Sequence, residues 1–217
     1  VVALVVNNDV NGTFKNITTE GAQKLGIIYS YCFGTRDLSG TRIGCNHNSI
    51  GYGAQVANSY KCEIVGLSAA NCRRGADFSG IEIPTRMSAV LDSAADGGGL
   101  DFVGGNLTLV SSGFGGHETS EHNLYARNRV SNVKSGIVCR GVNEVVSDNT
   151  FFGDVQSECV LIQRGMNTTV TNNTYDSNLR PAKILNVVSS DDNDQKCPWF
   201  VSIMNPPYEA GFYTIKD

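Results

Sequence analysis

The sequence lacks several features that define common protein classes. Lys and Arg number 17 against 21 Asp and Glu, so the net charge is −4 and there is no basic stripe of the kind that binds nucleic acid. No run of about 18 apolar residues is present, so we expect no membrane insertion. Long amphipathic helical patterns are also missing, which argues against a helical bundle.

The spacing of the cysteines does not match a metal-binding or disulfide pattern. The seven cysteines are odd in number and include no C-x-x-C pair, which argues against a zinc site or a disulfide framework. We therefore expect buried free thiols that pack as small apolar side chains. The opening VVALVV lacks the basic region and cleavage site of a signal peptide. Because the chain starts at Val1, we expect it to be a fragment of a longer protein.

What the sequence does contain is the signature of strands and turns. Short runs rich in Val, Ile, Tyr and Phe alternate with clusters of Gly, Asn, Ser and Asp, and glycine alone occurs 24 times. This alternation predicts an all-β fold. At 217 residues a single core is the default.

The chain repeats itself. GIVCRGVNEVVSDNTF (136–151) and VLIQRGMNTTVTNNTY (160–175) match at an offset of 24, through Arg-Gly, a following Asn, a Val, Asn-Thr and a final aromatic residue. IGCNHNSIGYGAQV (43–56) and VGLSAANCRRGADF (65–78) match at 22. The second comparison aligns Ile43 with Val65, Gly53 with Gly75 and Val56 with Phe78, and Val133 lies 22 residues before Val155.

A period of 21 to 28 residues with two or three short strands fits one rung of a parallel β-helix. Side chains alternate along each strand. The inward positions are Ala54, Val56, Ala76, Phe78, Ile137 and Cys139, and the outward ones include Gln55, Asp77 and Arg140. A column of Asn128, Asn149 and Asn173 predicts a tight turn with positive φ and amides that bond from rung to rung.

The phrases VVSDNTFFGD and TVTNNTYDSN resemble the rung ending of the pectin-lyase-like superfamily of right-handed parallel β-helices. Within that superfamily the chain looks most like a bacteriophage tailspike, because its rungs are rich in Asn, Ser and Gly, irregular in length and contain unpaired cysteines. The resemblance covers roughly residues 1–83 and 123–180. It implies a right-handed β-helix over residues 1–180.

Two segments depart from the repeat. Residues 84–122 are Gly-rich and contain one alternating strand, Asn106–Val110. We expect an insertion there, with a hairpin that rises off the rungs as a groove wall or subunit contact.

Residues 181–217 hold the only Trp, and we expect a cap over the last rung or a trimer-forming segment.

Candidate catalytic acids are few. A hydrolase of this fold needs two carboxylates, about 5 Å apart for retention or 6.5–9.5 Å for inversion. Asp77 points outward, Glu82 follows on the same rung, and Glu118 in the insertion is a third candidate. The stretch GGHETSEH, which contains His117, does not have H-E-x-x-H spacing, so we expect no metal and no cofactor.

Candidate substrate-binding residues are Gln55, His117, Arg140 and Arg164. Gln55 lies one rung below Asp77, and Arg140 and Arg164 are 24 residues apart in one predicted outward column. Stacked arginines suit an acidic sugar or the aspartates of a neighbouring subunit, and the sequence leaves both open.

The tailspike resemblance implies a homotrimer in the virion tail. It also implies binding and depolymerisation of a bacterial surface polysaccharide, either O-antigen or capsule, by glycoside hydrolysis. Two alternatives stay open: a non-catalytic glycan-binding adhesin or stem segment, and a polysaccharide lyase. A secreted protein is the alternative to the virion.

Overall fold

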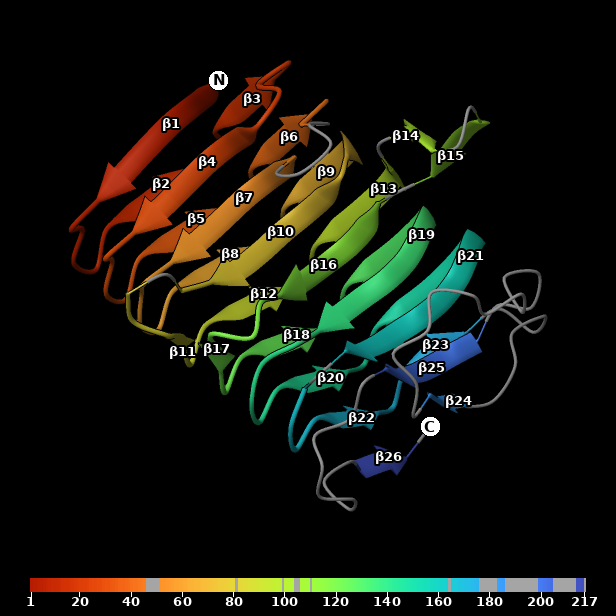
Figure 1. Cartoon of the computed structure of the whole chain (residues 1–217). Coiled ribbons are helices and arrows are strands. Elements are labelled where there is room, and N and C mark those ends of the chain that lie inside the picture. Colours follow the sequence, from red (N-terminus) through yellow and green to blue (C-terminus); the bar gives the residue numbers. More distant parts are fainter. Residues whose placement is uncertain are drawn as a thin grey trace.

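The computed structural model describes residues 1–45, 51–80, 82–98, 100–103, 106–109, 111–163, 165–175, 183–185, 199–204 and 214–216. These residues form strands and turns and contain no helix. The chain coils from the N-terminal end to the C-terminal end of one stack, so each circuit lies beside the previous one (Figure 1). No described helix has the length and apolar character needed to cross a membrane. The predicted parallel β-helix is confirmed.

Each rung contributes strands to three faces. The first face is β1 (Val2–Asn7), β4 (Leu25–Ser30), β7 (Tyr52–Ala57), β10 (Arg74–Ser79), β16 (Ser112–Gly116), the later halves of β19 (Arg129–Cys139) and β21 (Thr150–Gln163), and β25 (Trp199–Met204), which also pairs with β24 (Lys183–Leu185). The second face is β2 (Thr13–Lys15), β5 (Arg36–Leu38), β8 (Glu63–Val65), β12 (Ala89–Leu91), β18 (Leu124–Ala126), β20 (Val145–Ser147), β22 (Thr169–Thr171) and β26 (Thr214–Lys216).

The third face is β3 (Thr18–Glu20), β6 (Thr41–Ile43), β9 (Ser68–Cys72), β13 (Ala94–Gly98), the early halves of β19 and β21, and β23 (Thr174–Tyr175). A short pair, β11 (Thr85–Arg86) and β17 (Ser120–Glu121), lies at the turn between the first and second faces. All neighbouring rungs pair in parallel, as the short repeat predicts.

The observed register confirms part of the predicted alignment. Val56 pairs with Phe78, and Val133 pairs with Val155, both at an offset of 22. The alignment of Ile43 with Val65 is wrong, because Ile43 pairs with Ala70 on the next rung. The connection from β6 to β7 is longer than the connection from β9 to β10. One fixed offset therefore cannot hold for a whole rung.

The predicted insertion over residues 84–122 is too wide. Within it, β12 pairs with β8 and β18, and β16 pairs with β10 and β19, so these strands are ordinary rung members. The departure from the stack is an antiparallel hairpin of β14 (Leu100–Val103) and β15 (Asn106–Leu109). The hairpin confirms the strand expected near Asn106, and it explains why 35 residues separate Ser88 from its partner Asn123.

The described strands of the C-terminal segment continue the ladder. β25 pairs with β21, and β26 pairs with β22, both in parallel. These strands add a further rung beyond residue 180. A capping or trimer-forming role for residues 181–217 stays a prediction.

The high Asn and Gly content has a conformational cause. Residues with φ between 50° and 72° stand in columns, one per rung, at the turns. Asn and Gly adopt this left-handed region at lower cost than other residues. The longest columns are Asn11, Gly34, Lys61, Met87, His122, Asn143 and Asn167, and Asn16, Ser39, Gly66, Asp92, Arg127, Asp148 and Asn172.

The predicted asparagine ladder is present, with one correction. The Asn149 side chain accepts hydrogen bonds from the Asn128 backbone and side-chain amides at 2.9 and 3.0 Å, and donates to Asn173 Oδ1 at 2.9 Å. The positive φ belongs to the residue before each Asn, such as Asp148 at 57°. The column therefore arises from buried amide bonding, because each amide satisfies backbone groups inside the turn.

We expect Asn149→Ala to lower the free energy of unfolding by about 2 kcal/mol, because it leaves the Asn128 amide and the Tyr125 carbonyl without their partner. Urea unfolding followed by circular dichroism measures the change. Gln156→Ala, at an exposed position of the neighbouring strand, is the control. Equal stability of the two variants would contradict a structural role for the ladder.

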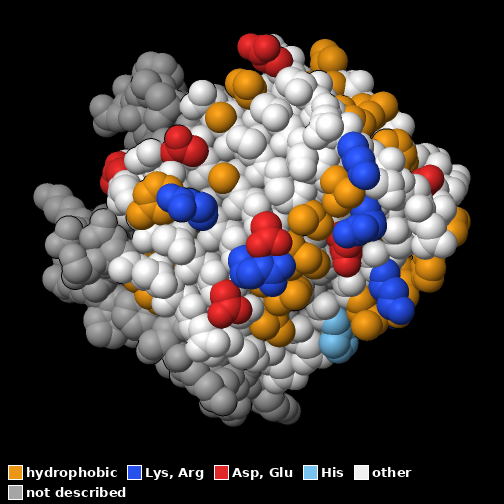
Figure 2. Space-filling view, turned by 180° about the vertical axis from the view of Figure 1, so that it is seen from behind, with side chains coloured by type: hydrophobic (Ala, Val, Ile, Leu, Met, Phe, Trp, Pro, Cys, Tyr) orange, Lys and Arg blue, Asp and Glu red, His pale blue; other side chains and the backbone are white. Residues whose placement is uncertain are grey.

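The core is continuous along the stack and mainly apolar, although it also contains the buried Arg42–Asp37 ion pair and Glu144. All six inward residues predicted on the first face are fully buried. Six of the seven cysteines are buried and form no disulfide bond, as expected, and Cys197 lies outside the described residues. The surface in Figure 2 mixes Lys and Arg with Asp and Glu side chains and shows no single basic patch on that side.

Candidate functional site

A column of glycines shapes the first face. Gly26, Gly53, Gly75, Gly113 and Gly136 occupy one register position on successive strands. A Cβ atom at each would lie within 3 Å of the carbonyl oxygen of the next rung, so only glycine fits. A Cβ atom at Gly75 would point at the core side chains of Ala69 and Phe114, although the next residue, Ala76, also faces the core. The alternation of side chains is therefore interrupted by a local bend at this column, and Arg74 faces outward, toward Asp77.

Tyr52 and Arg74 lie on the outward side of this face, in register with Ser112, and both are largely buried there. The Arg74 guanidinium lies 5.5 Å from the centroid of the Tyr52 ring, and its Nε donates to Ser112 Oγ at 2.9 Å. Gly115 leaves room for that guanidinium, since a Cβ there would lie 3.2 Å from Arg74 Cζ. The outer face at β10 and β16 is therefore built around one arginine.

Asp77 is the carboxylate partner of Arg74. The Arg74 Nη1 group donates to Asp77 Oδ1, and the Asp77 side chain is 0% exposed. Asp77 Oδ2 faces His117, with 3.4 Å between the oxygen and Nε2. The same His117 nitrogen lies 3.2 Å from the Tyr52 hydroxyl. We call Tyr52, Arg74, Asp77, His117 and Arg140 the first-face cluster.

Electrostatics in the first-face cluster favour an added anion. Burial lowers the pKa of His117, and Arg74 and Arg140 lower it further against the opposing effect of Asp77, so the ring is neutral at pH 7. Burial and the nearby Arg74 also lower the pKa of Arg140. Arg140 Nε donates to Gln163 Oε1 at 2.8 Å, and within the described ranges Arg140 has no carboxylate within 4 Å.

The structure brings together most of the residues proposed from the sequence. Asp77, His117 and Arg140 belong to the first-face cluster. Gln55 pairs with Asp77 in the ladder, and its amide donates to Ser79 Oγ at 2.8 Å. Glu118 is exposed and interacts electrostatically with His117 and Arg140.

Two predicted residues are not in the cluster. The Glu82 carboxylate accepts a hydrogen bond of 2.7 Å from the Tyr31 hydroxyl in an exposed turn, so its predicted pairing with Asp77 receives no support from the contacts of either residue. Arg164 lies outside the described residues. The position expected above Arg140 belongs to Gln163, because β19 and β21 pair at an offset of 23 here rather than 24.

Sequence analysis missed Tyr52 and Arg74. Both directly precede glycines that had been aligned, Gly53 and Gly75. Simple alternation from Ala54 and Ala76 would place Tyr52 and Arg74 inside the core, and the glycine bend reverses their direction. The Asp77 carboxylate, which alternation places on the outer side of the strand, is buried there and not exposed to solvent.

Among the described residues, no group of three or more His, Cys, Asp or Glu side chains is placed to hold a metal ion.

Comparison with known proteins gives no family assignment. No family model matches the chain, and no curated protein matches it. Among solved structures, a crystal structure of PfbA, a surface adhesin of Streptococcus pneumoniae, aligns with a TM-score of 0.35 and 11% sequence identity. The alignment covers 97% of this chain and 61% of that one. Similarity at this level carries no argument about function.

Proposed function

We propose that the chain is a glycan-binding segment of a surface protein and that the first-face cluster binds an acidic group of a polysaccharide. The observation that carries this proposal is Arg140, a partly buried guanidinium beside a second arginine and without an ion pair in the part of the chain that the structure describes. An anion placed there would relieve the repulsion between the two arginines.

The surroundings of Arg140 suit a sugar. His117 and Gln55, both half-buried, present an imidazole and an amide on the same outer face, and the buried Tyr52 hydroxyl lies 3.2 Å from His117 Nε2. Hydroxyl groups of a saccharide can bond to such neutral donors and acceptors. A stack of parallel rungs also offers an extended surface that a polymer can follow.

The tailspike resemblance directs the choice of ligand. It makes bacterial O-antigen and capsule polysaccharides with uronic or other acidic sugars the first to test. A virion location and a homotrimer remain parts of this proposal. Light scattering coupled to size exclusion measures the oligomeric state directly.

The expected result is saturable binding of an acidic polysaccharide such as polygalacturonate, with no binding of neutral dextran. Binding should weaken as salt increases, because ion pairs at a partly exposed site are screened. Arg140→Gln should weaken binding about tenfold or more, the usual effect of losing a hydrogen bond to a charged group. Isothermal titration calorimetry measures both quantities.

Arg129→Gln is the matched control, since Arg129 is exposed on the third face and lies over the Phe152 ring. It removes the same charge from a different surface. Equal affinities of Arg140→Gln and Arg129→Gln would overturn the proposed site. Failure of the wild-type chain to prefer acidic over neutral polymers would overturn the ligand class.

Hydrolysis stays a prediction from the family resemblance. The acids that interact electrostatically with His117 are Asp77, which belongs to the first-face cluster, and the exposed Glu118; a hydrolase requires two carboxylates to act on one glycosidic bond. Reducing ends released from the bound polysaccharide, and lost in Glu118→Gln, would support it. Absorbance near 235 nm from a new double bond would favour the lyase alternative, and binding without product would favour the adhesin.

A further inference from the structure

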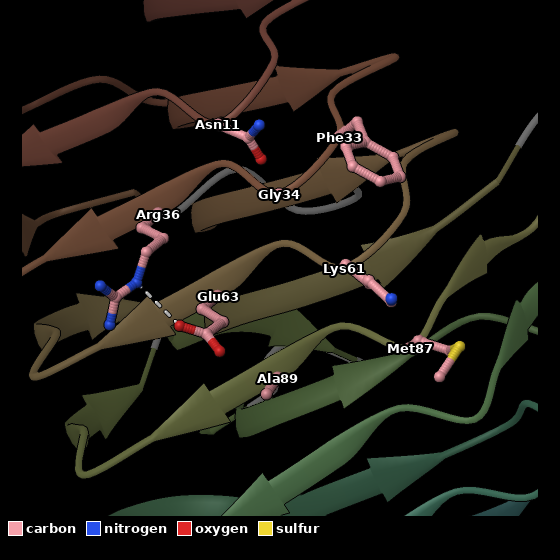
Figure 3. A pocket seen from close by; sticks show the side chains of 8 residues that line it. All are labelled: Asn11, Phe33, Gly34, Arg36, Lys61, Glu63, Met87 and Ala89. Carbon is pink, nitrogen blue, oxygen red and sulfur yellow. Dashed lines mark hydrogen bonds and ion pairs between the residues drawn. The ribbon is translucent and has the colours of Figure 1, made fainter.

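A hollow lies away from the first-face cluster, at the turn between the first and second faces. The left-handed column contains Asn11, Gly34, Lys61 and Met87 on successive rungs. The Asn11 side-chain oxygen occupies the space that a Cβ atom at Gly34 would need, and Asn11, Gly34 and Lys61 line a cavity at this edge (Figure 3). The cavity has a volume of about 540 Å³, which is within the range of small-molecule sites.

One wall of this hollow is apolar and exposed. The Phe33 ring stacks on Tyr60 with 5.6 Å between centroids and 22° between planes. Phe33 is 45% exposed and Met87 is 52% exposed. The Tyr60 hydroxyl donates to Met87 Sδ at 3.0 Å, which fixes the order of the three side chains. Exposed aromatic and methionine side chains that line a cavity mark a contact surface.

The opposite wall is charged. Arg36 Nε and Glu63 Oε2 form an ion pair of 2.8 Å across two rungs of the second face, as Figure 3 shows. Lys61 projects beside the hollow, with its Nζ 5.4 Å from the Tyr60 centroid. Of the carboxylates that the structure describes, none lies within 4 Å of Lys61 Nζ.

The backbone at the hollow is held in a costly conformation. Lys61 has φ of 54° and Met87 has φ of 51°, where a non-glycine residue costs about 1–2 kcal/mol. Four other rungs place Asn or Gly in this column, which lowers that cost, and a fifth places His122 there. At Lys61 and Met87 the left-handed turn directs both side chains to the lining of the cavity.

We propose that this hollow binds one acidic monosaccharide unit, with an apolar ring face against Phe33, hydroxyls toward Asn11 and Glu63, and the carboxylate at Lys61. The site shares its ligand class with the proposed function, but it uses none of the residues of the first-face cluster. A free sugar and a sugar within a polymer present the same chemistry here.

The methionine methyl groups provide a local test. With ¹³C-methyl methionine, titration of the whole chain with glucuronate should shift the Met87 resonance in a saturable manner. Met166, on a distant rung of the same edge, should not shift. Glucose should have a much smaller effect than glucuronate, because it lacks the carboxylate.

Lys61→Gln should weaken glucuronate binding about tenfold, and Phe33→Ala should weaken it for glucuronate and glucose alike. Lys134→Gln removes a charge from an exposed site elsewhere and should change nothing. Lys61→Gln retains the backbone strain, so it tests the charge even if Phe33→Ala fails to fold. Arg140→Gln should leave the Met87 shift intact, which separates this site from the first-face cluster.

Three outcomes would overturn the inference. The first is an unchanged Met87 resonance at saturating glucuronate. The second is equal binding by Lys61→Gln and Lys134→Gln. The third is a Met87 shift that follows protein concentration and not sugar, which would mean that a second copy of the chain covers the hollow.

Discussion

Replacing Arg42 with methionine is expected to destabilise the protein by about 3–5 kcal/mol, the usual cost of breaking a buried ion pair. Arg42 is the largest fully buried side chain of the described core. Its Nη2 lies 2.5 Å from Asp37 Oδ2, and both side chains are 0–1% exposed. The guanidinium also donates to the backbone carbonyls of Ile17 and Thr41. Removing it leaves the Asp37 carboxylate in the core without its countercharge.

The penalty should depend on pH. Burial raises the pKa of Asp37, and Arg42 opposes this shift. Without Arg42 the folded carboxyl binds a proton more tightly than the unfolded one, so the unfolding free energy of the variant falls as pH rises through the raised pKa. The deficit relative to wild type should therefore be smaller near pH 4 than at pH 7.

Urea unfolding midpoints at the two pH values measure this effect. Arg36→Met is the control, because its ion pair with Glu63 is about half exposed and such pairs contribute at most about 1 kcal/mol. The double variant Asp37→Leu/Arg42→Met should recover part of the loss, since it removes both charges. A midpoint for Arg42→Met equal to that of Arg36→Met would contradict the account of this pair.

Glu144 is expected to make the protein less stable as pH rises from about 4.5 to 7. The side chain is fully buried and accepts hydrogen bonds from Ser120 Oγ at 2.7 Å and from the Gly141 amide at 3.2 Å. Burial raises the pKa of Glu144 from 4.5 to about 7. In this window the folded protein holds a proton that the unfolded chain has released, so unfolding becomes easier with increasing pH.

The size of this effect is about 3 kcal/mol, since each pKa unit corresponds to about 1.4 kcal/mol. Glu144→Gln keeps an acceptor for Ser120 and cannot ionise, so its unfolding free energy should fall less between pH 5 and pH 8. The lowered pKa of His117 makes the protein more stable as pH rises. This contribution is the same in wild type and Glu144→Gln, so it cancels when their unfolding free energies are compared. Glu20→Gln, at an exposed position of β3, is the control. If the unfolding free energies of wild type and Glu144→Gln changed equally with pH, Glu144 would not hold a proton in the folded protein.

The sequence predicted the fold through local rules that the β-helix obeys strictly. Inward residues such as Val56 and Phe78 alternate because strands alternate. Asn128 and Asn149 recur because their amides bond between rungs. The rung boundaries were less predictable. The turn lengths vary, and the hairpin interrupts one rung, so residues 84–98 and 112–122 looked like an insertion although their strands pair within the stack.

The candidate site was only partly predictable for a physical reason. Asp77 and Arg140 follow from alternation on the first face. Alternation does not predict the position of Arg74, because the bend at Gly75 turns its side chain outward. It does not predict the buried Arg42 either, because arginine is rarely found fully buried in a protein core. The Asp77–Glu82 pairing stays a prediction; Glu82 lies past the end of the strand, where its carboxylate accepts a hydrogen bond from Tyr31.

The most direct test of the glycan-binding account is a crystal structure of the chain with an acidic oligosaccharide such as tri-galacturonate. The account predicts a sugar carboxylate bound to the Arg140 guanidinium beside Arg74, with the chain of sugars lying along the outer surface of β7, β10, β16 and β19. An oligosaccharide bound only on other surfaces, or a carboxylate that contacts neither arginine at full occupancy, would contradict it.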